Sequence, residues 1–267
     1  MTKQQERYRE ILIAPLRECA LYTPKFGHSS SGGYSLEEFQ RLYGSDAFYK
    51  WLGLDNPLMY SAHKAAGGIT SIYRQIGIGC ERLVRAIFMD YLGLKEEEAN
   101  WSYSVVGANG KARTLYLDGR IEIESIRNEE AKRRVTTWID NVSTSLALTP
   151  GVKNAITGVV FEVRQGYKSK DSKRQNADIS NASNAYANGY IPCLMVMSAQ
   201  IDDDIVIRYR NAKWEILQGY VAGSTSTSTY EFFDKVIGFD LASFMTSNQK
   251  FFQKEINHIL QQLMRAK

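Results

Sequence analysis

The chain has 267 residues, of which 44% are hydrophobic, and a formal net charge of +4. This length and apolar content allow a sizeable buried core. No run of about 18 apolar residues is present, so we expect no membrane-spanning helix. Residues 1–9 are polar and charged, which predicts a cytoplasmic protein without a secretory signal.

The three cysteines, Cys19, Cys80 and Cys193, are far apart in the sequence. They have neither the spacing of metal ligands nor the pattern of a disulfide framework. A reducing cytosol is the simplest interpretation of this arrangement.

Two helices are expected near the start of the chain. Residues 8–21 carry apolar side chains at helical spacing, although Pro15 interrupts them. Ser35 precedes a second helical segment over 36–43, and Glu38 stands at the position that completes a capping box.

The pair Gly67-Gly68 indicates a break before the most regular helix of the sequence, over 70–92. This helix has one apolar stripe and is expected to end at Gly93. Glu81 lies next to the stripe, close to the apolar face. A salt bridge to Arg85, one helical turn later, is the ordinary explanation for this glutamate.

Strands and helices alternate in the rest of the chain. Alternating or continuous apolar runs predict strands over 101–106, 113–126, 156–168, 191–197 and 214–221. Helices are predicted over 128–148, 171–188 and 247–264. This order predicts an α/β fold with a central mixed sheet flanked by helices.

Four basic residues lie within one short segment that only Asp171 opposes: Lys168, Lys170, Lys173 and Arg174. Such a cluster can follow the phosphates of a nucleic acid. A solvated surface loop can have the same composition, so the cluster alone does not decide between the two.

Two acids stand out by their position. Asp118 interrupts a strand just before Gly119, and Glu162 lies in the middle of a strand rich in valine and phenylalanine. A carboxylate inside an apolar strand is costly unless it is paired or binds a cation. Arg164 lies on the same face of the strand as Glu162, so a buried ion pair is one explanation.

One carboxylate from each of two neighbouring strands also makes a site for a hard cation. Mg²⁺ binds one or two protein carboxylates and completes its shell with water and phosphate oxygens. Such an ion can activate water and stabilise the phosphate during hydrolysis. Asp118 and Glu162 are therefore candidate Mg²⁺ ligands, and Arg164 or Lys168 could offset the charge that develops nearby.

Lys168 shares the face of Glu162 only if the strand alternates regularly as far as this lysine. It lies about 13 Å further along the strand, so it reaches the site only if the strand bends near Gly166. Lys173, on the following helix, is another candidate for this cation.

These features together resemble the PD-(D/E)XK nuclease core. The shared order is a helix with a glutamate, a strand with Leu117-Asp-Gly119, a strand with an acid followed by a basic residue, a helix and a buried strand. The stretch 161–178, FEVRQGYKSKDSKRQNAD, is similar to type II restriction endonucleases, and among them to the two-subunit asymmetric cutters of the BbvCI type. The resemblance covers about residues 70–200.

The resemblance implies a role for each candidate acid. Asp118 and Glu162 would be the metal-binding acids, and Glu81 the helix carboxylate that often supports the metal site. Two positions depart from the family pattern, since Arg164 stands where lysine is usual and Leu117 where proline is frequent. Arginine stays protonated and cannot act as a base, so the identity of the catalytic cation is open.

The resemblance further implies a single endonuclease domain over 1–267. Within it we expect a helical N-terminal region (1–69), the nuclease core (70–200) and a C-terminal strand, loop and helix (201–267). The expected activity is Mg²⁺-dependent, sequence-specific cleavage of double-stranded DNA. Because a duplex has two strands to cut, a homodimer or a heterodimer with a related chain is expected.

Other functions fit the same residues. One is a DNA repair or recombination nuclease on the same fold. Another is a DNA-binding subunit whose chemistry has decayed, as Arg164 suggests. A last one is a protein-interaction domain in which Glu162 and Arg164 form a structural pair.

Overall fold

The computed structural model describes residues 2–26, 32–106, 112–167 and 172–265. Within these ranges the chain is a mixed α/β protein with two sheets, of which the larger has four strands and is itself mixed. The predicted α/β fold with a mixed sheet flanked by helices is confirmed at this level.

The chain forms two compact units. One contains residues 1–79 together with 247–267, and the other contains 80–246. The last helix of the chain therefore packs with the N-terminal helices, although it follows the sheet region along the chain. The long helix α4 (Pro57–Leu92) contributes residues to both units.

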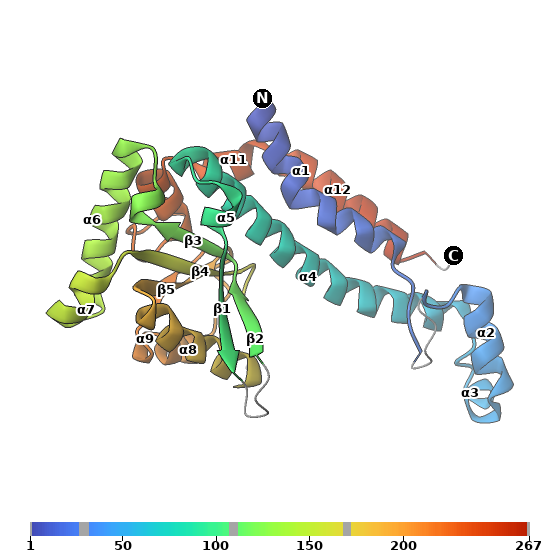
Figure 1. The fold of residues 1–267 in the computed structure, drawn as a ribbon. Helices are drawn as coiled ribbons and strands as arrows, with labels where there is room; N and C mark the ends of the chain where they lie inside the picture. Colours follow the sequence, from blue (N-terminus) through green and yellow to red (C-terminus); the bar gives the residue numbers. More distant parts are fainter. Residues whose placement is uncertain (1, 27–31, 107–111, 168–171, 266–267) are drawn as a thin grey trace. The chain divides into compact units, whose positions relative to one another are not determined.

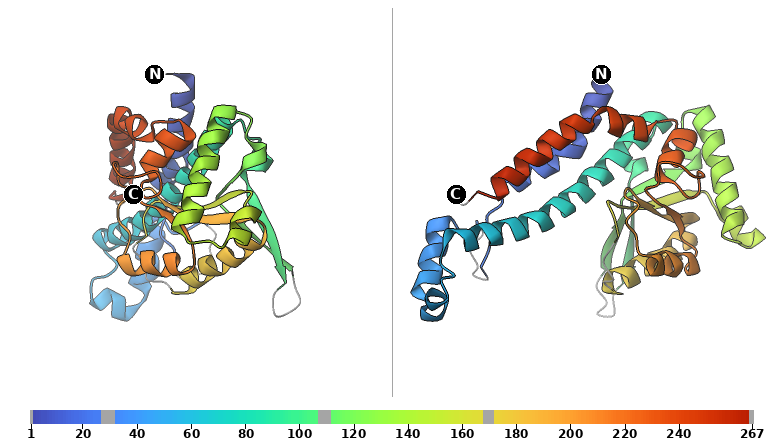
Figure 2. Two further views of the ribbon diagram at one scale, coloured as in Figure 1. Left: turned by 90° about the vertical axis from the view of Figure 1, so that its left-hand side faces the viewer. Right: turned by 180° about the vertical axis from the view of Figure 1, so that it is seen from behind.

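The first unit consists of helices. They are α1 (Lys3–Arg17), the short η1 (Glu18–Leu21), α2 (Leu36–Ser45), α3 (Ala47–Trp51), the first part of α4, and α12 (Gln249–Leu263). Ser35 and Glu38 form the predicted capping box of α2. Helices α1 and α12 lie side by side (Figure 1, Figure 2). Their apolar residues meet those of α4 in a core formed by Ile13, Leu16, Cys19, Ile72, Ile259 and Leu263.

The predicted break at Gly67-Gly68 is wrong, because α4 continues through both glycines. A Cβ atom at Gly67 would lie 2.0 Å from the hydroxyl of Tyr22, and one at Gly68 would lie 2.6 Å from a methyl of Leu263. The two glycines therefore mark places where neighbouring segments pack directly against the helix backbone.

The second unit is built around a four-stranded sheet in the order β3-β4-β5-β6. These strands are β3 (Gly119–Glu122), β4 (Gly158–Arg164), β5 (Tyr190–Val196) and β6 (Glu215–Leu217). Strand β3 runs antiparallel to β4, whereas β4, β5 and β6 are parallel. An antiparallel hairpin, β1 (Trp101–Val106) and β2 (Ala112–Leu117), precedes the sheet. Strand β5 is a continuous apolar run, and β4 is one apart from Glu162 and Arg164, because both faces of the sheet are covered.

Helices cover both faces of this sheet (Figure 1). On one face, Val160 and Leu194 share a cluster with residues of α8 and with Tyr209 of α9. On the other face, Phe161 contacts Phe88 of α4 and an aromatic ring of the π-helix η3. The remaining elements of the unit are α5 (Glu96–Ala99), η2 (Ile123–Ser125), α6 (Glu129–Ser145), α7 (Pro150–Ala155), α8 (Ser172–Ala187), α9 (Asp203–Asn211), α10 (Thr229–Glu231), η3 (Phe232–Ile237) and α11 (Leu241–Ser247).

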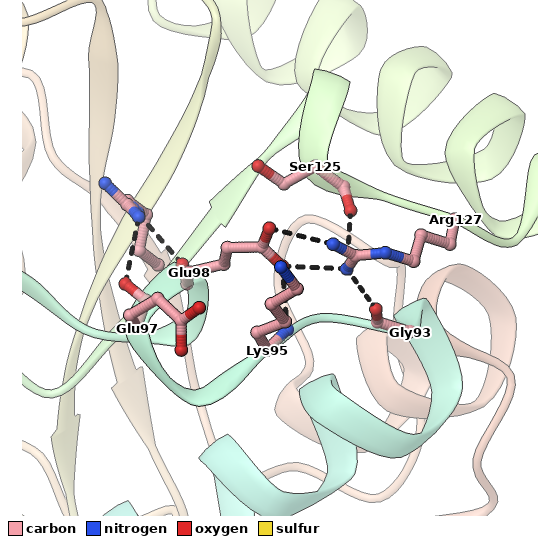
Figure 3. Close-up of polar contacts among 7 residues, drawn as sticks. Gly93, Lys95, Glu97, Glu98, Ser125 and Arg127 are labelled. Atoms are coloured by element: carbon pink, nitrogen blue, oxygen red, sulfur yellow. Dashed lines mark hydrogen bonds and ion pairs between the residues drawn. The ribbon is translucent and has the colours of Figure 1, made fainter.

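A polar cluster fixes the segment between α4 and β3 (Figure 3). Arg127 donates to the main-chain oxygen of Gly93 and forms an ion pair with Glu98 at 2.7 Å. The hydrogen bonds from Arg127 lower the pKa of Glu98 to about 2. Arg120 of β3 donates to the main-chain oxygen of Glu98 at 2.9 Å. Strand β3 is thereby tied to α5 close to the point where Asp118 enters the sheet.

None of the described helices has the apolar length that crossing a lipid bilayer requires. The side chains of Cys19, Cys80 and Cys193 are buried free thiols, in agreement with the lack of a disulfide pattern in the sequence.

Candidate functional site

Asp118 lies at the junction of β2 and β3, beside Glu162 of β4. Gly119 and Phe161 are paired across the two strands, so Asp118 and Glu162 are the next residues on each. The amide of Asp118 donates to the oxygen of Phe161 at 2.8 Å, and its carboxylate accepts from the amide of Val163 at 2.8 Å. Asp118 therefore binds the chain on both sides of Glu162, which brings the two candidate acids together.

Glu162 forms an ion pair with Arg164, two residues further along β4. Both side chains are buried, with 8% of Glu162 and 12% of Arg164 exposed. Nitrogen Nη2 of the same guanidinium lies 3.4 Å from Oδ2 of Asp178 on α8. The ion pair that the sequence offers as one explanation for Glu162 is therefore present, and it extends to a second acid.

Asp178 is held by hydroxyl groups as well as by the guanidinium. The Tyr209 hydroxyl, from α9, donates to Oδ2 of Asp178 at 2.6 Å. The Tyr167 hydroxyl lies 3.5 Å from the same oxygen and 3.1 Å from the hydroxyl of Tyr209. Burial and the adjacent charge of Asp178 raise the pKa of Tyr209, so its hydroxyl remains a donor.

The charges of this cluster act on one another strongly because water is largely excluded. Burial raises the pKa of Asp118, whereas the Val163 amide and the charges of Arg164 and Arg85 lower it in part. Burial alone would lower the pKa of Arg164, but the neighbouring acids, Glu162 first, raise it. The guanidinium therefore stays charged among three carboxylates.

Arg85 connects the end of α4 to this cluster. Its Nη1 donates to the main-chain oxygen of Asp118 at 2.9 Å. Glu81 lies four residues earlier on the same helix, and residues at this spacing share a helix face. Glu81 is thereby placed on the side of α4 that carries Arg85, and its role as a supporting carboxylate stays a prediction.

Asp118 and Glu162 suit a hard divalent cation in their chemistry. Each carboxylate has two oxygens with several lone pairs, so the contacts described above do not exhaust either group. Among the described residues, no three His, Cys, Asp or Glu side chains are arranged to hold a metal ion. Two carboxylates are nevertheless sufficient for Mg²⁺, which takes its other ligands from water and phosphate. Asp118 and Glu162 therefore have the donor chemistry that Mg²⁺ requires, and their role as its ligands stays a prediction.

The regular alternation that puts Lys168 on the face of Glu162 does not continue past the end of β4. Arg164 and Tyr167 are an odd number of residues apart, yet both side chains reach Asp178. The strand therefore changes phase around Gly166, as the glycine allows. Lys168 itself lies outside the described residues.

The other predicted basic residues are only partly placed. Lys170 lies outside the described residues. Lys173 and Arg174 belong to the first turn of α8, but their side chains are not among those described. The contact of these residues with phosphate therefore stays a prediction.

Sequence reasoning missed Asp178 and Tyr209, and it named Arg85 only as a partner of Glu81, not of Asp118. Asp178 ends the stretch that carries the family resemblance, but nothing in an alanine- and asparagine-rich helix marks it as buried. Tyr209 comes from α9, a helix that the sequence analysis does not predict. Comparison of the chain with protein-family models, with curated proteins and with solved structures gives no match.

Proposed function

We propose that the chain is a Mg²⁺-dependent, site-specific double-stranded DNA endonuclease of the type II restriction-enzyme kind. The observation that supports the proposal is the position of Asp118, which binds the backbone on both sides of Glu162 and so lies beside this second acid. Arg164 adds a permanent positive charge beside them. Two acids and a cation on adjacent strands are what the PD-(D/E)XK resemblance implies.

Each group then has a defined task in phosphodiester hydrolysis. Asp118 and Glu162 would hold the ion, which supplies polarisation of the phosphate and activation of a water molecule. Arg164 would offset the negative charge that develops on the phosphate, and it would not accept a proton. The Val163 amide fixes the carboxylate of Asp118, and Arg85 fixes its main chain.

Glu162→Gln tests the proposal, because it keeps the size of the side chain and removes the charge that would hold the metal. With mixed-sequence plasmid DNA and Mg²⁺, the wild type should give discrete fragments. With EDTA in place of Mg²⁺, it should not cleave the DNA. The variant should lose at least ~100-fold in rate and still bind DNA in a gel-shift assay.

The matched control is Glu215→Gln, the same change at a glutamate of the same sheet. Glu162 and Glu215 are both 6% exposed, so Glu215→Gln reports the effect of removing a buried carboxylate that lies outside the candidate site. The thermal unfolding of both variants shows whether each is folded under the assay conditions. Full cleavage in EDTA, or equal activity of Glu162→Gln and wild type, contradicts the proposal. Smeared products would favour a repair or recombination nuclease.

A second candidate function is a DNA-binding subunit that has lost its chemistry. The observation in its favour is the ion pair between Arg164 and Glu162, which engages one of the proposed metal ligands. This function predicts specific DNA binding without cleavage, also after addition of candidate partner chains.

A further inference from the structure

One nitrogen of Arg164 lies between two acids that come from different elements. Nη2 contacts Oε1 of Glu162 on β4, and it lies 3.4 Å from Oδ2 of Asp178 on α8. The Asp178 side chain is 7% exposed, which is as buried as Glu162. A small movement of the guanidinium is therefore enough to exchange one carboxylate for the other.

The present arrangement does not satisfy the guanidinium completely. Nε of Arg164 is buried and has no hydrogen-bond partner among the described residues. An unsatisfied buried donor raises the free energy of the present position, so a second position of the guanidinium can have a similar free energy.

Asp178 is held by Tyr209 at the same oxygen that faces Arg164. The 2.6 Å hydrogen bond from Tyr209 holds the oxygen that faces the guanidinium, and Tyr167 approaches the same oxygen only at 3.5 Å. Tyr209 is fully buried and its ring packs against Trp214, so its hydroxyl is a fixed point.

We propose that Asp178, oriented by Tyr209, is an alternative ion-pair partner for the Arg164 guanidinium. The guanidinium moves from Glu162 to Asp178 when a divalent cation binds Glu162. This inference rests on the proposed function. Arg164 and the cation compete for the carboxylate of Glu162, because both are positive. An ion pair with Asp178 lets Arg164 release Glu162 and still remain paired and beside the reacting phosphate. Asp178 and Tyr209 are then positioning residues that act through Arg164.

Mn²⁺ binding to the DNA-free protein tests the inference without measuring cleavage. The loss of the EPR signal of free Mn²⁺ measures this binding. Arg164→Ala should bind Mn²⁺ about tenfold more tightly, because the competing charge is gone. Tyr209→Phe keeps all charges but releases Asp178, so it should weaken Mn²⁺ binding about fivefold. Tyr167→Phe removes the 3.5 Å contact with Asp178 and the 3.1 Å contact between the two hydroxyls. It keeps the hydrogen bond from Tyr209 to Asp178 and is therefore the matched control.

The decisive comparison is a double-mutant cycle. Tyr209→Phe should weaken Mn²⁺ binding in the wild type and have no effect when Arg164 is alanine, because Tyr209 acts only through Arg164. Equal effects in both backgrounds, or none in the wild type, overturn the inference. If Arg164→Ala does not fold, Arg164→Gln, which removes the charge but keeps a polar side chain longer than alanine, takes its place.

The two proposals fail in different ways. A wild type that binds no Mn²⁺ overturns the proposed function and this inference together. A wild type that binds Mn²⁺ at Glu162, as shown by loss of binding in Glu162→Gln, but gives no coupling between Tyr209 and Arg164 overturns the inference alone.

Discussion

Glu215 is a buried acid that the proposed chemistry does not use. Burial raises its pKa to about 7, and the charge of Arg210 lowers it only in part. The residue lines a cavity of about 420 Å³ together with Arg210, Lys213 and Ser226. A glutamate in this environment is neutral at mildly acidic pH and destabilises the fold once it ionises.

The pH dependence of stability should therefore change in Glu215→Gln. Glutamate in the unfolded chain ionises near 4.5, so the folded state loses stability as the pH rises from about 4.5 through 7. The expected loss from this residue is about 3 kcal/mol at pH 8. Urea unfolding at pH 5 and pH 8 should show most of that loss in the wild type and not in the variant. Parallel pH profiles of the two proteins would show that Glu215 ionises normally.

At the residue scale, the sequence was most informative where a residue contradicted its surroundings. Glu162 in an apolar strand and Asp118 before a glycine are such residues, and the fold brings them together. Asp178 and Tyr209 give no local signal, because their burial arises from the packing of α8 and α9 on the sheet. Periodicity along one segment cannot show which side chains from distant segments meet.

At the element scale, the glycines of α4 differ in what surrounds them. A Cβ atom at Gly79 would lie 2.5 Å from the main-chain oxygen of Leu12 in α1, whereas no neighbouring atom of the described residues lies within 4 Å of one at Gly77. The main chain of α1 cannot rotate away as a side chain can. Gly79 therefore sets how closely α1 approaches α4.

Alanine substitutions at these two glycines should have opposite effects on stability. Gly77→Ala should stabilise the protein by roughly 0.5–1 kcal/mol, because alanine favours the helix. Gly79→Ala should destabilise it by roughly 1–3 kcal/mol, because α1 has to move. Thermal unfolding of the two variants beside wild type checks this. Stabilisation by both substitutions would mean that α1 does not pack on Gly79.

Among the elements, those with strong local signals were predicted and those decided by packing were not. The capping box at Ser35 and the stop at Gly93 depend on neighbouring residues, and both are found. The glycine pair in α4 resembles a break in the sequence because the residues that pack against it, Tyr22 and Leu263, are distant along the chain. Helix α9 was missed because it begins in a run of acids headed by Asp202, which in fact caps it.

For the whole molecule, the proposed function predicts assembly on DNA. One chain carries one pair of candidate acids, and a duplex has two strands to cut, so the active species should contain two copies or a related partner. Sedimentation of the protein with its DNA fragment should give the mass of a dimer. Two identical copies would be related by a two-fold axis. An active monomer that cuts both strands in one binding event would contradict this prediction.

The basic segment predicts a salt effect that belongs to the whole complex. If Lys170 contacts a phosphate, Lys170→Ala should weaken binding to all DNA sequences alike and lower the slope of log affinity against log salt by about one. Fluorescence anisotropy at several salt concentrations measures this slope. A change in sequence preference would instead place Lys170 on a base edge.

Helix α4 passes from one unit into the other, which restricts where the chain can gain or lose residues. The boundary at residues 79 and 80 falls inside a helix of 36 residues, not in a loop. Each inserted or deleted residue rotates all that follows by about 100° about the helix axis. A single-residue insertion between Leu83 and Phe88, which are both buried, would therefore rotate one of these side chains relative to the other and away from its present contacts, so length changes among related chains should occur in loops and spare this helix.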